Sequence, residues 1–295
     1  MVVFQGIYPA LVTPTDAHGE VNLPVLTRIV EYHLSKNVDG FYIGGTTGEG
    51  IYMTVADRQK MTERVLEVVN GQVPIIAHVG AVSLADAQTL ARHAAEHGAN
   101  GFASIMPPLY NSVASVVSYY KALAASVPDL PFFSYILNPQ LDPVAVVSQL
   151  LQVPNLVGAK YTGPNMFEMR NVMDLGGENW ITFSGMDEES AYAVMMGVQG
   201  CIGSTLNFMP NVYREIRDAV NAGDHAKAQD LQVRANKITY AMIQVGFSGA
   251  LVSVLNHLGF ECGAPRLPNL ALSEEAKTKL FASLRETDFE EFVAL

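Results

Sequence analysis

Lys160 is the residue whose place in the sequence indicates chemistry most directly. It follows the apolar run 156–159, and a lysine inside a buried strand is expensive unless it has a use. Burial disfavours the ammonium and favours the free amine, which attacks ketones to form a Schiff base. The residues alone leave an alternative open, namely a side chain that reaches solvent from the strand end or pairs with a carboxylate.

A glycine-rich loop at 44–50, with the sequence GGTTGEG, is the second candidate site. Its glycine spacing differs from that of a dinucleotide fingerprint, and it has no lysine for a P-loop. Its backbone N–H groups and the hydroxyls of Thr46 and Thr47 suit a small carboxylate or phosphate. A tight turn between a strand and a helix is the alternative interpretation.

Polar residues also lie in or just after other apolar runs. Tyr135 lies in one run, and Ser204 lies at the end of another. Asp187 and Glu188 follow a third run, where paired carboxylates can bind adjacent hydroxyls. The same two carboxylates could instead supply the negative charges at the start of the next helix.

The elements that must position these residues form a repeating pattern of short apolar runs, turn residues and amphipathic stretches. The runs are near-continuously apolar, as in parallel strands buried on both faces, and N-cap signals at Thr54, Ser83 and Asn165 begin three of the helices. We therefore predict an α/β fold, a (β/α)8 TIM barrel, with a doubly wound open sheet as the runner-up. The eight runs are 6–12, 40–45, 73–79, 101–106, 131–137, 156–161, 181–185 and 200–205.

The C-terminal quarter of the chain has no convincing strand after Gly223. Residues 224–258 and 273–294 have helical patterns. The predicted organisation is a catalytic barrel over 1–222 and a helical extension over 223–295 that packs on it. In such a barrel the reactive groups lie at the C-terminal ends of the strands.

His78, His93 and His97 are interpreted as structural. The segment 93–97 fits an HxxEH zinc pattern, but it lies at a helix C-terminus, where histidine also complements the helix dipole. Barrel architecture would place this segment on the outer ring, so no metal is expected there. His78 lies near a strand end and could be a ligand or a base, but a packed, hydrogen-bonded histidine is the favoured interpretation.

Composition excludes several classes of protein. The chain has 295 residues, 49% of them hydrophobic, so it can bury a core and is not disordered. A net charge of −11 argues against non-specific binding of nucleic acid or of anionic lipid. Cys201 and Cys262 form no disulfide framework and no metal pair, and neither a signal peptide nor a membrane span is predicted. We expect a cytoplasmic protein that buries part of its surface in an oligomer.

These motifs resemble those of the pyruvate-dependent class I aldolases, the family of N-acetylneuraminate lyase and dihydrodipicolinate synthase. The resemblance covers nearly the whole chain, and it is carried by the loop 45–49, Tyr135 and Lys160. It implies a (β/α)8 barrel, a Schiff-base lysine, usually a homotetramer, and neither a metal nor an organic cofactor.

Within the family the chain is most similar to the N-acetylneuraminate lyase branch. The segments 160–168, 185–188 and 202–207 carry this similarity. The synthase branch needs an arginine shortly after the tyrosine, and no arginine lies between Tyr135 and Lys160. The loop after Tyr135 departs from the lyase pattern, because its proline comes one place late.

The resemblance implies reversible cleavage of N-acetylneuraminate to N-acetylmannosamine and pyruvate, with a small sugar acid as the binding partner. It implies an imine on Lys160, and a proton relay from Tyr135 through Thr46 and Tyr110. Substrate contacts are implied for Thr46, Thr47, Thr162, Gly185, Asp187, Glu188 and Ser204. The alternatives are another pyruvate-dependent aldolase or hydratase, dihydrodipicolinate synthase, and a non-catalytic sugar-acid sensor.

Overall fold

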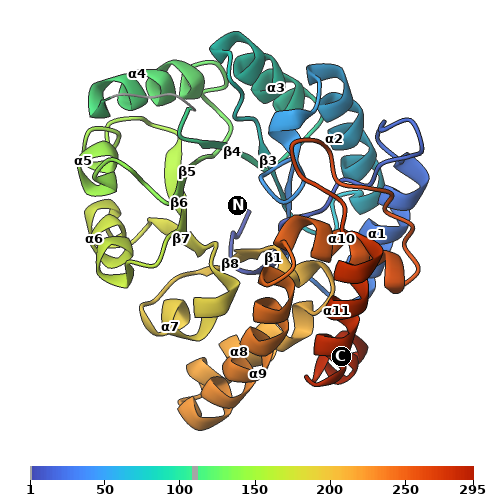
Figure 1. The fold of residues 1–295 in the computed structure, drawn as a ribbon. Helices are drawn as coiled ribbons and strands as arrows, with labels where there is room; N and C mark the ends of the chain where they lie inside the picture. Colours follow the sequence, from blue (N-terminus) through green and yellow to red (C-terminus); the bar gives the residue numbers. More distant parts are fainter. Residues whose placement is uncertain (1, 108–111) are drawn as a thin grey trace.

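Eight strands form one parallel sheet in the computed structural model, which describes residues 2–107 and 112–295. The strands are β1 Gly6–Pro9, β2 Phe41–Ile43, β3 Ile75–His78, β4 Gly101–Ile105, β5 Phe132–Leu137, β6 Leu156–Thr162, β7 Ile181–Ser184 and β8 Gly200–Gly203. Their order is β1-β8-β7-β6-β5-β4-β3-β2, and a parallel bridge between Ala10 and Tyr42 joins the two end strands. The sheet therefore closes into the predicted barrel, and the open-sheet alternative is wrong (Figure 1).

A helix follows each strand and contributes to the outer ring seen in Figure 1. These helices are α1 Leu23–Ser35, α2 Val55–Val69, α3 Leu84–Glu96, α4 Val113–Ala124, α5 Pro143–Ser148, α6 Met166–Gly176, α7 Ser190–Met195 and α8 Pro210–Asn221. The side chains of Thr54, Ser83 and Asn165 accept hydrogen bonds from backbone N–H groups in the first turns of α2, α3 and α6. The three predicted helix starts are thereby confirmed.

The helical extension at the C-terminus consists of α9 His225–Ile243, α10 Phe247–His257, α11 Glu274–Arg285 and α12 Phe289–Ala294. Residues 224–258 and 273–294 are helical, as predicted, and each range is divided into two helices, the first at Gly246. Gly246 has a φ of 103°, a conformation that favours glycine and ends a helix.

Within the described part of the chain no single helix is long and apolar enough to span a membrane, and α9 with α10 meets that criterion only as a pair bent by 109°.

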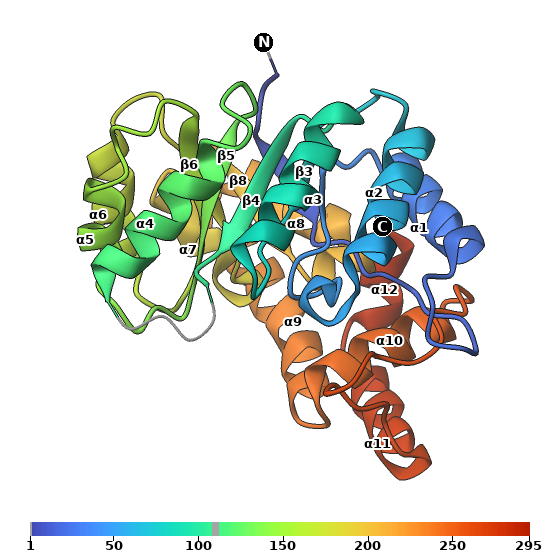
Figure 2. The same ribbon diagram turned by 90° about the horizontal axis from the view of Figure 1, so that it is seen from above.

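Aromatic side chains fill the part of the barrel nearer the N-terminal ends of the strands. The rings of Phe4 and Phe133 lie 5.1 Å apart, and those of Tyr8 and Phe183 lie 4.9 Å apart. Figure 2 shows the N-terminus leaving the barrel at the end opposite to α10 and α11. The strands terminate at the other end, which Figure 1 views along the barrel axis, and the reactive groups of such a barrel lie there.

Candidate active site

Lys160 lies on β6 inside the barrel, with only 4% of its surface exposed. Its Nζ lies 4.6 Å from the centre of the Tyr42 ring and 4.4 Å from that of Tyr135. Among the ion pairs of the described residues, none involves Lys160. Within the described residues the amine therefore lies against two aromatic rings and is not paired with a carboxylate.

Tyr135 lies on β5, directly opposite Lys160 in the strand register. Its ring packs edge-on against Tyr42 and His78, with centroid distances of 6.2 and 6.0 Å. Its hydroxyl lies 3.4 Å from the Oγ1 of Thr46. The structure thus brings together the amine, the phenol and the loop hydroxyl that the sequence analysis singled out separately.

The glycine-rich loop needs its glycines because backbone segments approach one another closely. A Cβ on Gly50 would lie 1.9 Å from the carbonyl oxygen of Gly44, and one on Gly48 would lie 2.6 Å from that of Leu11. At the other side of the loop, the Thr47 hydroxyl lies 2.6 Å from the Ser204 hydroxyl. The loop is therefore a compact turn, as the alternative held, and it also presents two hydroxyls at the barrel mouth.

Glu49 is a residue whose role the sequence analysis missed. Its carboxylate accepts hydrogen bonds of 2.8 Å from the backbone N–H of Arg266 and from the Asn269 amide. The Arg266 guanidinium in turn donates to the Thr13 carbonyl at 2.8 Å. Glu49 thus anchors the glycine-rich loop to the segment after α10. The only signal in the sequence is a carboxylate inside an otherwise small and neutral turn.

Asp187 lies in a short 3-10 helix, Asp187–Glu189, directly before α7, and is 5% exposed. Its Oδ2 accepts two 2.7 Å hydrogen bonds, from the backbone N–H and the hydroxyl of Thr205. Its Oδ1 is buried and has no hydrogen-bond partner among the described residues. Burial raises the pKa of this carboxyl to about 6. One oxygen is therefore committed to the protein, and the other is a buried acceptor that lies against Gly203 at the end of β8.

Thr162 and Gly185 frame the approach of the Lys160 side chain. Thr162 ends β6, and its buried hydroxyl oxygen has no partner in the described part of the protein. A Cβ on Gly185 would lie 1.8 Å from that oxygen and 2.7 Å from the Lys160 Cε. Glycine at 185 therefore leaves the space that the lysine occupies.

Glu188 is half-buried, and its backbone carbonyl accepts a 2.9 Å hydrogen bond from the Asn236 side-chain amide.

His78 is a packed histidine, as the sequence favoured. Its Nδ1 lies 3.0 Å from the Gly44 carbonyl, and its Nε2 lies 3.0 Å from the backbone nitrogen of Ile105. The carbonyl must accept and the amide must donate, which assigns the ring proton to Nδ1. Burial lowers the pKa of His78 to about 3, and the charge of Arg58 acts in the same direction. Both nitrogens are therefore occupied in a neutral ring.

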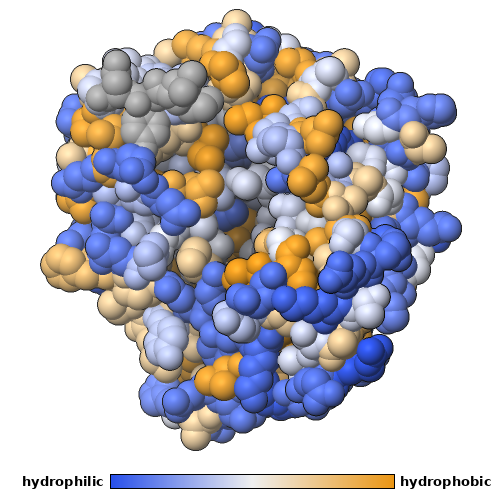
Figure 3. Space-filling view, in the orientation of Figure 1, coloured by the Kyte–Doolittle hydropathy of each residue, from blue (hydrophilic) through white to orange (hydrophobic). Residues whose placement is uncertain are grey.

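The mouth of the barrel contains open space near these groups. A cavity of about 110 Å³ lies between the glycine-rich loop and α10, and Thr46, Thr47, Ser204 and Phe247 contribute to its lining. Figure 3 shows the same face hollowed near the barrel axis. Lys160 is not among the residues that line this cavity.

The proposed relay residue Tyr110 lies outside the described residues.

The mouth has no set of metal ligands among residues 2–107 and 112–295. The one group of three His, Cys, Asp or Glu side chains close enough to share an ion is Glu63, His93 and His97. These residues belong to α2 and to the end of α3, in the outer ring. The mouth instead offers an amine, hydroxyls and carboxylates, a set suited to a polyhydroxylated organic acid.

Comparisons with known proteins agree with this geometry. The sequence model of the dihydrodipicolinate synthetase family matches residues 3–287. The N-acetylneuraminate lyase of Mediterraneibacter gnavus is 32% identical over 281 residues, which cover 92% of this chain and 89% of that one. The N-acetylneuraminate lyase of Mus musculus is 30% identical, with 97% and 93% coverage.

Solved structures match the whole fold. The N-acetylneuraminate lyase of Proteus mirabilis superimposes with a TM-score of 0.92 at 31% identity, over 97% of this chain and 99% of that one. The dihydrodipicolinate synthase DapA-2 of Bacillus anthracis gives a TM-score of 0.91 at 26% identity, with the same coverage. Both branches of the family therefore share this architecture.

Proposed function

The chain belongs to the dihydrodipicolinate synthetase family, and from this premise we propose that it cleaves N-acetylneuraminate reversibly to N-acetylmannosamine and pyruvate. Membership makes it a carbon–carbon lyase. The observation that carries the proposal is the buried Lys160 amine, held between the rings of Tyr42 and Tyr135 at the barrel mouth. A barrel that only bound a sugar acid would need neither this amine nor the phenol opposite it.

The first step of the proposed mechanism forms an imine. The Lys160 amine attacks the C2 ketone of the open-chain acid, and loss of water gives a protonated imine. Thr46 and Thr47 bind the C1 carboxylate, since their hydroxyls lie at the mouth beside Tyr135 and Ser204. The positive imine nitrogen then attracts the electrons of the bond that breaks.

The second step breaks the C3–C4 bond. The C4 hydroxyl loses its proton towards Tyr135, whose hydroxyl lies 3.4 Å from Thr46 Oγ1. The C3–C4 electron pair forms an enamine, and the aldehyde N-acetylmannosamine leaves. Protonation at C3 and attack of water on the resulting imine release pyruvate and restore the Lys160 amine.

The sugar tail is assigned to residues that follow β7 and β8. Asp187 has one unpartnered carboxylate oxygen, and Glu188 follows it in the same short helix. Ser204 lies next to Thr47 and so extends this polar surface. We assign the C6–C9 hydroxyls to these three residues, with Thr162 and Gly185 near the reacting carbons.

The synthase alternative lacks its carboxylate-binding residue. No arginine lies between Tyr135 and Lys160, so the loop after β5 brings no guanidinium to the mouth. In that loop Asn138 has a φ of 39°, and its backbone N–H donates to the Thr162 carbonyl at 2.8 Å. A shorter 2-keto-3-deoxy sugar acid remains the second candidate substrate, because this loop departs from the lyase pattern.

Pyruvate release from a panel of acids tests the proposed substrate. We expect the highest kcat/KM for N-acetylneuraminate, lower values for shorter 2-keto-3-deoxy sugar acids, and no condensation of pyruvate with the aldehyde used by the synthase. A preference for a shorter acid would reassign the substrate but keep the lyase chemistry. Absence of pyruvate release from every acid would overturn the proposal in favour of a sensor.

Glu188→Gln should weaken use of the nine-carbon acid much more than use of a truncated keto acid. The variant keeps the side-chain shape and removes a charged acceptor, which contributes about 1.5–3 kcal/mol per hydrogen bond. The expected fall in kcat/KM is therefore roughly 10- to 150-fold for the long substrate, measured against the short one in the same preparation. An equal loss for both substrates would show that Glu188 does not contact the tail.

Asp187 predicts a pH dependence that only the long substrate should show. Its carboxyl has a pKa raised to about 6, so it is ionised above pH 6 and accepts from hydroxyls there. Below pH 6 protonation should lower kcat/KM for the nine-carbon acid about tenfold per pH unit, relative to the truncated acid. The ratio of the two profiles, measured from pH 5 to 8, removes effects that Lys160 and Tyr135 have on both substrates. A flat ratio would contradict a role for Asp187 in tail binding.

We also propose that the protein is a cytoplasmic homo-oligomer. Large apolar side chains are exposed on α7 and α9, including Tyr192, Tyr240 and Ile243. Both cysteines are free and buried, which suits a reducing compartment. The family resemblance favours a tetramer, and sedimentation velocity of the full chain measures the state.

A further inference from the structure

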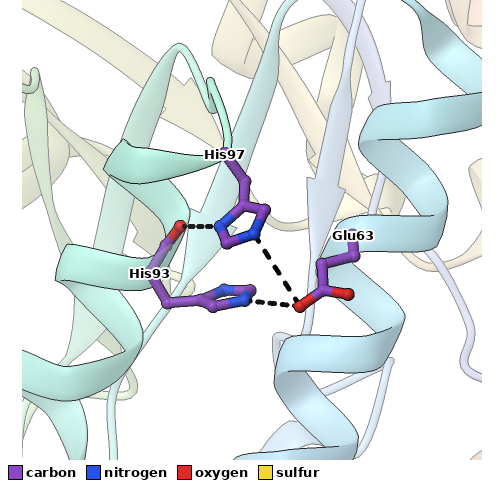
Figure 4. A group of neighbouring side chains, drawn as sticks. All are labelled: Glu63, His93 and His97. Atoms are coloured by element: carbon purple, nitrogen blue, oxygen red, sulfur yellow. Dashed lines mark hydrogen bonds and ion pairs between the residues drawn. The ribbon is translucent and has the colours of Figure 1, made fainter.

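Three side chains converge on the outer ring of the barrel (Figure 4). Glu63 projects from α2, and His93 and His97 project from the end of α3. Glu63 Oε1 lies 2.8 Å from His93 Nε2 and 3.9 Å from His97 Nε2. The three potential ligand atoms all lie within 4.8 Å of one another.

The backbone already orients His97 as a ligand. Its Nδ1 lies 2.8 Å from the His93 carbonyl, to which it must donate a proton. The lone pair of a neutral ring is then on Nε2, the nitrogen that points towards Glu63 in Figure 4. Metal-bound histidines commonly donate their other ring N–H in this way, and that contact fixes both the tautomer and the ring orientation.

We propose that Glu63, His93 and His97 form a surface site for a divalent cation of the zinc class. Two imidazole nitrogens and one carboxylate oxygen are a donor set that zinc accepts, with water completing a tetrahedron. Bonds of about 2.0–2.2 Å place tetrahedral ligands about 3.3–3.5 Å apart. The 2.8 Å contact must therefore lengthen, with loss of the proton that His93 Nε2 donates to the carboxylate, and the 3.9 Å contact must shorten. Glu63 and His97 are exposed and can make these movements.

The site is accessible, and it joins two helices. His93 has 11% of its side chain exposed, against 43% for His97 and 50% for Glu63, so an ion can enter from solvent. The rings of His93 and His97 are stacked with centroids 4.0 Å apart, so the two imidazoles already lie together at the end of α3. A bound ion would fasten α2 to α3 without touching the barrel mouth.

Glu96 lies inside the HxxEH segment but is not a ligand. In zinc patterns of this kind the two histidines bind the metal and the glutamate of the motif does not. The third ligand here comes from α2, thirty residues before His93. Glu96 does not belong to the ligand group. Its removal is therefore a matched control, because it takes a carboxylate from the same turn without removing a ligand.

Calorimetric titration of the untagged full chain with ZnCl2 tests the proposal. We expect one strong site per chain in the parent, and a dissociation constant raised at least about 10- to 100-fold in Glu63→Gln and in His97→Ala, since losing even an outer-shell partner costs that much. Glu96→Gln should bind as the parent does. Loss of binding in Glu96→Gln with retention in Glu63→Gln would overturn the assignment, as would no strong binding by the parent.

Thermal unfolding gives an independent readout in the same proteins. At zinc concentrations near a hundred times the dissociation constant, the parent and Glu96→Gln should gain a few °C in Tm, and EDTA should reverse the gain. Glu63→Gln and His97→Ala should show the parent's circular dichroism but no such gain. An equal gain in all four proteins would show that zinc binds elsewhere and would overturn the proposal.

Discussion

Lys160→Met should abolish turnover, with kcat lowered on the order of 10⁴–10⁶-fold, because the variant lacks the nucleophile that forms the imine. Methionine keeps the unbranched chain between the Tyr42 and Tyr135 rings, so the fold should survive. In the parent, borohydride added with pyruvate should inactivate the protein and leave a three-carbon adduct on Lys160 in a peptide map. The variant should form no adduct under the same conditions.

The matched control for this prediction is Lys121→Met. Lys121 is exposed on α4, in the outer ring of the barrel. Its loss should change neither turnover nor trapping. An adduct on another lysine, or a Lys160→Met variant that retains turnover, would exclude the Schiff-base mechanism proposed for this residue.

The fold could be predicted from the sequence because its signals are local. Each apolar run is buried on both faces of the barrel, and each N-cap residue lies three places before the backbone N–H that it accepts from. Lys160 was also identifiable locally, since a charged residue interrupts an apolar run. The break at Gly246 was missed because a glycine inside an apolar pattern does not by itself end a helix.

The connections that complete the site could not be predicted. The hydrogen bond between Thr47 and Ser204 spans 157 residues, and that between Glu49 and Arg266 spans 217. Closure of the barrel creates these contacts, and no periodicity within one element encodes them. For the same reason Glu63 could not be paired with His93 before α2 and α3 were placed side by side.

Tyr135→Phe should lower kcat by roughly 10²–10⁴-fold, the usual contribution of a positioned acid–base group. The substitution removes only the hydroxyl, which lies 3.4 Å from Thr46 Oγ1. The ring contacts with Tyr42 and His78 remain, so the fold and the environment of Lys160 should be preserved. Imine formation with pyruvate should therefore still be trapped by borohydride, while cleavage of the sugar acid is slow.

Tyr8→Phe is the matched control, because it removes another buried hydroxyl from the same barrel. Tyr8 packs against Gly40, directly before β2, at the end of the barrel away from the reaction. The turnover of Tyr8→Phe should stay within a few-fold of that of the parent. Tyr161 is a poor substitute for Tyr135, since its hydroxyl donates to Glu168 at 2.6 Å. Near-normal turnover in Tyr135→Phe would nevertheless refute the relay assigned to Tyr135, because no other part of that side chain can carry the proton.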